Sequence, residues 1–450
     1  MLNVAAIADL REKIRGPLLT PDAPDYDATR KVFNGMVNKR PALIARCTRP
    51  SDVVACVNFA CDHGVLLSVR GGGHNFAGKA VCEGGLMLDF TLMKGITVDP
   101  EHRFARAQAG LNLGEFDRET QKFGLATTLG VATTTGISGL TLGGGYGYLA
   151  GKYGLACDNL RSAEIVTADG KIRRCSAEEY PDLFWGLRGA GANFGIVTEL
   201  EYTLYPLSTV LGGVIFYPLG REVFRFYDEF SRSAPDELTM IGAAMTGPNG
   251  APAFATVACY CGDPAIGEEV LKPLRTFGTP IADLIQLRPY LEIQSLFDPI
   301  NPPGRRYYNK AHNISKVNDG AIDTVLHHMA KVPTPNGSIA FQQLHGTAAR
   351  VAATDTAFPH RYDHHVAWIT PIWDDPADDA RVIHWAREFW EGLKPFVDQA
   401  VYVNALEDDL EAGERPVREA YGASYERLRA LKRKFDPSNV FSQNSNIKPA

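Results

Sequence analysis

Two glycine-rich stretches of the sequence carry the residue types best suited to hold a ligand. The first, SVRGGGHNFAG at residues 68–78, places three glycines directly before His74 at the end of an apolar run. The second, TLGVATTTGISGLTLGGGYG, occupies residues 128–147. Glycine lets the backbone approach a ligand closely and direct N–H groups at an anion. Either stretch alone is more typical of a tight turn, but together in one α+β unit they could hold a pyrophosphate from both sides.

The common nucleotide-binding motifs do not match the sequence. GAGANFG at residues 189–195 follows a predicted helix and spaces its glycines as GxGxxxG, whereas the dinucleotide pattern is GxGxxG. GYLAGKY at residues 147–153 has one residue too few between its glycines for a P-loop, and no Ser or Thr follows Lys152. A nicotinamide enzyme and a nucleoside triphosphatase are therefore disfavoured.

Hydrolytic and metal-dependent chemistry are disfavoured as well. Ser138 lies in GISGLTLGG, which is not the GxSxG pattern of a nucleophile elbow. No HxH or HExxH pattern surrounds His74, so we expect no metal site. The adjacent histidines at 327–328 and 364–365 point apart on a helix or strand, and we interpret both pairs as surface or structural residues.

The elements around the glycine-rich stretches are short strands and helices. An apolar run at residues 65–69 predicts a buried strand that stops at the first glycines, so the GGGH segment is a loop at a strand end. Residues 112–123 predict a helix, and residues 160–175 predict a hairpin. From about residue 210 to residue 400, alternating strands and amphipathic helices predict an antiparallel sheet with helices on one face. A charged helix is predicted at residues 425–435.

Composition restricts the class of protein. A chain of 450 residues is long enough for two domains. A net charge of −6 without a lysine- or arginine-rich run argues against a nucleic-acid partner. The N-terminus does not read as a secretory signal, and no run of about 18 apolar residues predicts a membrane span. Eight cysteines without a CxxC pair indicate buried thiols, which favours a cytoplasmic location.

Five motifs in order give the chain a family resemblance. They are VRGGGHNFAG, GISGLTLGGGYG, YGLACDNLRSAEIVTADG, PDLFWGLRGAGANFGIVTELEYTLYP and the terminal YERLRALKRKFDPSNVFSQNSNI. The chain resembles the PCMH-type FAD-binding fold of the vanillyl-alcohol oxidase superfamily and, within it, the berberine-bridge-enzyme-like oxidoreductases. The resemblance implies an α+β fold with a two-subdomain FAD-binding domain at residues 1–207. It also implies an antiparallel-sheet substrate domain at 208–400, backed by helices, and a C-terminal segment at 401–450 that returns to the FAD domain.

The same resemblance implies roles for residues of the glycine-rich stretches. In the family, the histidine that ends the first glycine run is bonded to the 8α-methyl group of the flavin, so FAD would be bound covalently through His74. A neutral imidazole is a suitable nucleophile for that carbon. The other implied cofactor-binding residues are Gly71, Gly72, Gly73, Asn75, Phe76 and Gly78 in the first loop, Gly130, Thr134, Gly136, Ser138, Gly139 and Thr141 in the second, Gly195, Ile196 and Val197 on the adenine side, and Asn444 and Asn446 near the isoalloxazine ring.

Some positions depart from the family pattern. Bicovalent members carry a cysteine where this chain has Ala132, which predicts a single covalent link. Cys157 is interpreted as a buried thiol near the cofactor instead. Thr135 stands at the position that is thought to control oxygen access, and its valine-like shape favours an oxidase.

The catalytic base is less well defined. Many members have a tyrosine directly after the asparagine of YxNY, where this chain has Ala405. Tyr402 precedes Asn404 by two residues and is the predicted catalytic residue together with Thr135. On a strand, however, Tyr402 and Ala405 would face opposite sides. Further candidates from the substrate domain are Tyr307, Tyr308, Lys310, Gln343, His345, Trp368 and Thr370.

The sequence therefore predicts an FAD-dependent oxidase. It would oxidise a C–H bond next to oxygen or nitrogen in a small alcohol, sugar or secondary metabolite and reduce molecular oxygen to hydrogen peroxide. Two alternatives stay open at this point: a dehydrogenase of the same fold that uses another electron acceptor, and a flavin-binding protein without catalysis. The oligomeric state is not predicted.

Overall fold

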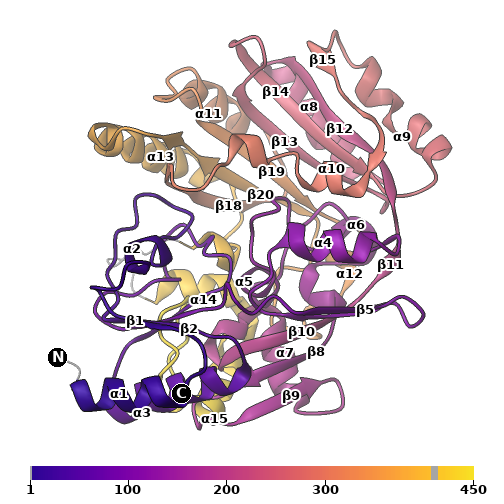
Figure 1. Cartoon of the computed structure of the whole chain (residues 1–450). Helices are drawn as coiled ribbons and strands as arrows, with labels where there is room; N and C mark the ends of the chain where they lie inside the picture. The colour runs from indigo at the N-terminus through magenta and orange to yellow at the C-terminus, as the bar shows by residue number, and fades with distance from the viewer. Residues whose placement is uncertain (1–2, 407–413) are drawn as a thin grey trace.

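A computed structural model describes residues 3–406 and 414–450 of the chain, and three sheets dominate it (Figure 1). Two small sheets form the lower half of the molecule in this view, and an eight-stranded sheet lies above them. Helices and mainly antiparallel strands are mixed along the chain, which confirms the predicted α+β class. None of the helices in the described ranges is long and apolar enough to cross a membrane.

The first small sheet carries the GGGH loop at its edge. Its strand order is β1 (Leu18–Leu19), β2 (Leu43–Arg46), β4 (Leu86–Asp89), β3 (Leu67–Arg70), and β2, β4 and β3 are parallel. The parallel connection from β2 to β3 runs through α3 (Pro50–His63). Gly64 ends α3 in the left-handed conformation, with φ 60°. The shorter helices α1 (Val4–Lys13) and α2 (Tyr26–Thr29) precede β2.

The second small sheet is antiparallel. Its order is β5 (Ile96–Asp99), β6 (Phe104–Gln108), β10 (Ile196–Thr203), β8 (Leu160–Val166), β9 (Ile172–Ser176), and β8 with β9 is the predicted hairpin. The predicted helix at 112–123 is α4 (Leu113–Gln121), which begins at a capping box formed by Asn112 and Glu115. The remaining helices of this half are α5 (Ile137–Leu142), α6 (Ala150–Tyr153) and α7 (Pro181–Ala190).

The large sheet is antiparallel throughout and has the order β15-β12-β14-β13-β19-β20-β18, with β16 also paired to β12. Its strands are β12 (Thr209–Pro218), β13 (Leu238–Thr246), β14 (Pro252–Tyr260), β15 (Ala282–Asp283), β16 (Gln286–Pro289), β18 (Lys310–Ile314), β19 (Ser338–Leu344) and β20 (His364–Thr370). Two ribbons stand apart from it: β7 (Leu125–Ala126) with β11 (Tyr205–Pro206), and β17 (Arg306–Tyr307) with β21 (Ile372–Trp373).

Strand alternation gives the large sheet two different faces. Ile339 and Phe341 of β19 share a core with Phe224 and Phe389, which lie on helices above the sheet. Leu344 of the same strand belongs to the core of the lower half. The helices of the upper face are α8 (Arg221–Arg232), α9 (Pro264–Thr276), α11 (Asp319–Met329) and α13 (Asp379–Leu393) (Figure 1). The opposite face is directed at the glycine-rich loops, because successive side chains of a strand point to opposite sides.

The C-terminal segment packs against the lower half of the molecule (Figure 1). It consists of α14 (Arg415–Tyr421), α15 (Tyr425–Phe435), whose bounds agree with the prediction, and an extended tail. Lys432 is fully buried and donates to the carboxylate of Asp436 at 2.7 Å and to the carbonyl oxygens of Asn193 and Phe441, both at 2.8 Å. A buried ammonium with three oxygen partners fixes the tail to the loop after α7.

Candidate functional site

The two glycine-rich stretches are in direct backbone contact at Gly72 and Gly136. A Cβ atom at Gly72 would come within 2.2 Å of the backbone nitrogen of Gly136, and a Cβ at Gly136 would come equally close to the nitrogen of Gly72. Only glycine permits this approach, so these two positions are required by the contact between the loops. The partnership that the sequence suggested for the two stretches is therefore present in the fold.

One cavity runs along this junction. Of the predicted cofactor-binding residues, it is lined by Gly71, Gly72, Gly73, His74, Asn75, Phe76, Gly136, Gly139 and Asn444, and Thr135 also lines it. The cavity further contains Val69, Lys79, Ala80, Leu140, Leu142, Gly143, Gly189, Ala190, Ala192, Asn193, Val403, Asn404, Tyr421, Gln443 and Ser445. It thus draws on both small sheets and on the C-terminal segment.

His74 is held from three directions. Its ring stacks on Phe33, with the ring centroids 4.1 Å apart and an interplanar angle of 25°. The Nε2 atom lies 2.9 Å from the hydroxyl of Thr134, and Nδ1 lies 3.4 Å from the hydroxyl of Thr135. Burial lowers the pKa of His74 to about 4, because the charged imidazolium loses hydration there. The imidazole is therefore neutral at physiological pH and has a nitrogen lone pair to share.

The loop that supplies both threonines is anchored by side chains of residues 294 and 298. Asp298 accepts hydrogen bonds from the backbone nitrogen of Thr133, at 3.0 Å, and from the hydroxyl of the same residue. Gln294, in α10 (Tyr290–Gln294), donates to the carbonyl oxygen of Gly130 at 3.1 Å. Two side chains from beyond residue 290 thus fix the loop that contacts His74.

Several other predicted cofactor residues do not line the cavity. The hydroxyl of Ser138 donates to the carbonyl oxygen of Ala109 at 2.9 Å, and the hydroxyl of Thr141 lies 2.8 Å from that of Tyr202. Their side chains are thus engaged within the protein. The cavity is likewise not lined by Gly78, Gly130, Gly195, Ile196, Val197 or Asn446. The cofactor contacts of these residues stay predictions.

Asn193 is a residue that sequence reasoning missed. It lies in GAGANFG, which the dinucleotide pattern excluded, yet it lines the cavity. Its side chain accepts from the backbone nitrogen of Ile447 at 2.9 Å and donates to the carbonyl oxygen of Ser445 at 3.4 Å. Gly189, in the same motif, has φ 135°, and a Cβ there would meet the backbone nitrogen of Phe358 at 2.4 Å. The motif therefore joins the tail and the large-sheet domain to the cavity.

The residues around Tyr402 do not form a strand. Residues 403–405 form a 3₁₀ turn, so the alternation of a strand does not apply to Tyr402 and Ala405. The Tyr402 hydroxyl accepts from the backbone nitrogen of Gly145 at 3.1 Å and from Nδ2 of Asn404 at 2.8 Å. Burial raises the pKa of Tyr402 far above its usual range. With both lone pairs occupied, this phenol can only donate its own proton.

A second tyrosine lies beside Tyr402. The ring of Tyr146 is 4.7 Å from that of Tyr402, and its hydroxyl lies 3.1 Å from Nε2 of His364. Nδ1 of His364 lies 2.7 Å from the carbonyl oxygen of Tyr362, which requires the proton on Nδ1 and makes Nε2 the acceptor. Burial lowers the pKa of His364 to about 4, so this imidazole is neutral too. His364 and His365 are both buried, so the surface alternative is wrong for this pair.

Five of the proposed bases are not among the residues that line the cavity. The ammonium group of Lys310 lies over the ring of Trp390, and the hydroxyl of Tyr308 accepts a hydrogen bond from Arg387. Trp390 and Arg387 both belong to α13 on the upper face. Gln343 donates to Ser231 of α8 on that face as well. The hydroxyl of Tyr307 donates to the carbonyl oxygen of Pro302. The imidazole of His345 lies directly against Gly151, where an added Cβ would meet its Nε2 atom. Strand parity and register determine where these side chains lie, and neither can be read from one sequence. Trp368 and Thr370 do face the lower half of the molecule.

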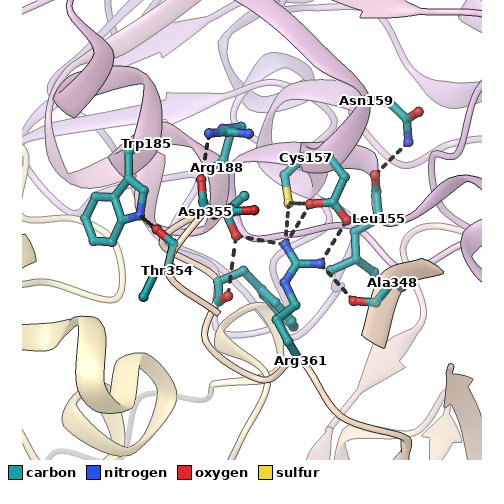
Figure 2. A network of polar contacts seen from close by, with 12 residues as sticks. Leu155, Cys157, Asn159, Trp185, Arg188, Ala348, Thr354, Asp355 and Arg361 are labelled. Atoms are coloured by element: carbon teal, nitrogen blue, oxygen red, sulfur yellow. Dashed lines mark hydrogen bonds and ion pairs between the residues drawn. The ribbon is translucent and has the colours of Figure 1, made fainter. Parts of the chain in front are cut away.

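A buried arginine joins the two halves next to this site (Figure 2). Arg361 donates to both carboxylate oxygens of Asp158, at 2.8 and 2.7 Å, and to the hydroxyl of Thr356 at 2.8 Å. The thiol of Cys157 lies beside the pair, 3.9 Å from the guanidinium, and burial raises its pKa strongly. Cys157 is thus the buried thiol that was predicted; of the eight free cysteines, Cys61 alone is exposed.

The residues of the cavity fit the expected FAD. The contact between Gly72 and Gly136 brings the two glycine-rich loops together, and both residues line the cavity. The buried side-chain oxygens of Asn444 and Asn446 have no hydrogen-bond partner within the described residues, and a polar ligand would satisfy them. Within the same residues, no cluster of histidine, cysteine, aspartate and glutamate could hold a metal ion.

Comparison with known proteins agrees with this description. Residues 41–176 match the family model of an FAD binding domain, and residues 401–448 match that of berberine and berberine-like proteins. (R)-6-hydroxynicotine oxidase of Paenarthrobacter nicotinovorans is 33% identical over 97% of this chain and 97% of its own, and an FAD-linked oxidoreductase of Dictyostelium discoideum is 31% identical over 97% and 96%. The crystal structure of 6-hydroxy-D-nicotine oxidase from Arthrobacter nicotinovorans covers 97% of this chain and 98% of its own, with a TM-score of 0.87 and 31% identity.

Proposed function

The chain belongs to the berberine-bridge-like FAD-linked oxidoreductases of the PCMH-type, vanillyl-alcohol oxidase superfamily, and from this premise we propose an oxidase whose flavin is bonded to His74. The substrate is a small alcohol, sugar or secondary metabolite that loses a hydride from a C–H bond next to oxygen or nitrogen. Molecular oxygen takes up the electrons and becomes hydrogen peroxide. Bound FAD supplies an electrophilic 8α-methyl carbon for the link and the hydride acceptor for the substrate.

The position and charge of His74 carry this proposal. The imidazole stands where the two glycine-rich loops meet, between Phe33 and two threonine hydroxyls, and it is neutral above about pH 4. In forming the link, one N–H bond and one methyl C–H bond break, and a new N–C bond forms. Both hydrogens leave as protons, and two electrons pass to molecular oxygen, the acceptor that the oxidase reaction already uses. Ala132 offers no second nucleophile, which supports a single link.

The surrounding residues have separate tasks in the reaction. Asn404 and Gly145 orient the Tyr402 hydroxyl, which can then donate a hydrogen bond to the substrate heteroatom. Thr135 lines the cavity next to His74, where its valine-like shape leaves room for oxygen to approach. The large sheet, placed above the loops, shields the substrate from bulk water and positions its C–H bond.

Acid denaturation of the yellow protein tests the link. Flavin that stays with the precipitate is expected for the natural chain, and flavin released into solution is expected for His74→Ala. His102→Ala serves as the control, because His102 is exposed and pairs only with Asp99 within the described contacts. Release of flavin from the natural chain would disprove the covalent part of the proposal.

Reoxidation kinetics test the choice of oxygen as acceptor. Stopped-flow mixing of the reduced protein with oxygen should restore the yellow colour rapidly and yield hydrogen peroxide. A sluggish reaction with oxygen, together with fast reoxidation by a quinone, would identify a dehydrogenase of the same fold. Failure of every alcohol, sugar and amine to reduce the flavin would instead indicate a flavin-binding protein without catalysis.

A further inference from the structure

Three aromatic rings pack together beside His74. The ring of Phe33, which stacks on the imidazole, lies 4.7 Å from the ring of Tyr307 and 6.1 Å from that of Phe76, measured between centroids. Phe33 and Tyr307 are buried and share a small core with Ile372. Both lie outside the motifs that carry the family resemblance, which therefore assigns them no role. We call Phe33, Phe76 and Tyr307 the aromatic brace.

Backbone hydrogen bonds hold Phe33 from both halves of the molecule. Its nitrogen donates to the carbonyl oxygen of Gly73, the residue before His74, at 3.1 Å. Its own carbonyl oxygen accepts from the nitrogen of Gly304 at 2.8 Å. The approach is close, because a Cβ at Gly35 would come within 2.1 Å of the carbonyl oxygen of Gly304. Phe33 is therefore fixed between the first glycine-rich loop and the segment that leads into β17.

Asn34 fixes the other two rings of the aromatic brace. Its Nδ2 atom donates to the carbonyl oxygens of Phe76 and Tyr307, at 2.8 and 2.9 Å, and its Oδ1 atom accepts from the nitrogen of Tyr307 at 3.1 Å. Asn34 is buried, so these bonds are shielded from water. Tyr307 lies in β17, which pairs with β21, and β21 follows β20 of the large sheet after one residue. Asn34 thus connects the large sheet to the surroundings of His74.

The aromatic brace restricts a movement of His74 that its hydrogen bonds leave free. The hydroxyls of Thr134 and Thr135 lie at the two ring nitrogens, and a hydroxyl can rotate to follow a ring that tilts. A nitrogen lone pair lies in the plane of the imidazole, so a tilt redirects it. Stacking on Phe33 opposes the tilt. Phe33 therefore determines the direction in which the nitrogen can form a bond, and a misdirected reacting atom slows a reaction.

We propose that Phe33 is a positioning residue for the attachment of flavin to His74, and that attachment requires the large sheet to be docked, because Asn34 and Tyr307 hold Phe33 from that side. The step is the one given above: one imidazole N–H bond and one methyl C–H bond break, an N–C bond forms, both hydrogens leave as protons, and molecular oxygen takes two electrons. This inference rests on the proposed function, since it assumes the covalent link.

Attachment kinetics test the role of Phe33. Full-length apoprotein is mixed with FAD, reversible binding is measured by quenching of the flavin fluorescence, and acid precipitation of timed samples gives the covalently held flavin. Phe33→Leu keeps an apolar side chain but removes the flat face, so it should slow attachment by about tenfold or more while reversible FAD binding is unchanged. Phe123→Leu, the same substitution at an exposed phenylalanine, should change neither.

The ring of His74 can also be observed directly by NMR. In protein with isotope-labelled histidine, stacking on Phe33 shifts the ring-proton resonances of His74 upfield, and His74→Ala identifies these resonances by their absence. Phe33→Leu should abolish the upfield shift, whereas Phe123→Leu should preserve it. A side chain that only filled space would leave both the resonances and the attachment rate unchanged when leucine replaces it.

Asn34→Ala tests the connection to the large sheet. It removes the three hydrogen bonds to the aromatic brace without touching the ring of Phe33, and attachment should slow severalfold. Asn38→Ala is the matched control, because Asn38 is exposed in the same segment and is bonded to Arg30 instead. Its attachment rate should equal that of the natural chain.

The possible failures are distinguishable. Attachment by Phe33→Leu at the natural rate would overturn the positioning role, and attachment by Asn34→Ala at the natural rate would overturn the connection to the large sheet. If Phe33→Leu does not bind FAD reversibly, Phe33→Met is measured in its place, and an unchanged rate there counts equally against the role. Release of flavin from the natural chain by acid contradicts the proposed link itself, and the histidine resonances then still decide whether Phe33 holds the ring.

Discussion

Asp298 is predicted to control the attachment of flavin from a distance. Its carboxylate holds Thr133 by the backbone nitrogen and the hydroxyl, and the next two residues contact the ring nitrogens of His74. Asp298→Ala removes both hydrogen bonds, while Gln294 still holds the loop at Gly130. We therefore expect a loop that is loosened at one point and an imidazole that is less well oriented towards the flavin.

The magnitude follows from the two lost contacts. Hydrogen bonds to a charged group contribute about 1.5–3 kcal/mol each, and solvent access to the half-buried carboxylate reduces that contribution. A net loss of about 2 kcal/mol, if it falls on the attachment step, slows that step about thirtyfold, since 1.4 kcal/mol corresponds to a factor of ten.

The assay follows attachment in time. Apoprotein is mixed with FAD, samples are precipitated with acid, and the flavin fluorescence that stays with the protein is measured. Glu292→Ala is the matched control, because Glu292 is exposed on the neighbouring α10. Attachment by Asp298→Ala at the rate of the natural chain, with equal reversible FAD binding, would refute the positioning role.

Three further predictions concern the fold around the site. Gly72→Ala should abolish FAD retention by forcing the glycine-rich loops apart, whereas Gly220→Ala, with open space around its Cβ, should retain FAD; the flavin-to-protein absorbance ratio measures both. Arg361→Ala leaves a buried carboxylate without its cation and should cost about 3–5 kcal/mol in the free energy of unfolding, whereas the exposed Arg350→Ala should change it little; urea denaturation measures both. Burial raises the pKa of Asp117 to about 8, so its contribution to stability is complete below its unfolded pKa of about 4 and is lost as the pH rises towards 8, at about 1.4 kcal/mol per pH unit. Asp117→Asn should flatten this decline, and a melting temperature that falls equally in both proteins between pH 5 and pH 8 would contradict it.

Local signals made much of the fold predictable. Helix α3 ends before Gly64 because glycine adopts the left-handed conformation readily, and α4 begins directly after Asn112 because the Asn112 side chain caps the first turn. The meeting of Gly72 and Gly136 was also predictable in kind, since two glycine-rich loops in one α+β unit can approach each other closely. Each of these signals depends on residues close together in the sequence.

The features that were not predictable depend on distant contacts. Lys310 and Trp368 both belong to the large sheet, but only the register between strands assigns them to opposite faces. Asp298 and Thr133 are separated by 165 positions, and nothing in either local sequence indicates their pairing. The turn at Tyr402 is set by packing against Gly145 and Asn404 rather than by strand propensity.

The hydrogen bonds at Tyr402 restrict the reaction itself. Asn404 donates from Nδ2 to the carbonyl oxygen of Leu140 as well as to Tyr402, which fixes the orientation of the amide. The phenol oxygen therefore receives two N–H donors and contributes only its proton. A substrate whose hydride leaves from carbon next to a neutral nitrogen needs no base, whereas an alcohol must also lose its hydroxyl proton. For an alcohol, we expect this proton to pass to Tyr146, whose hydroxyl is hydrogen-bonded to the neutral Nε2 atom of His364. Tyr146→Phe should therefore slow flavin reduction by an aromatic alcohol far more than reduction by an aromatic amine.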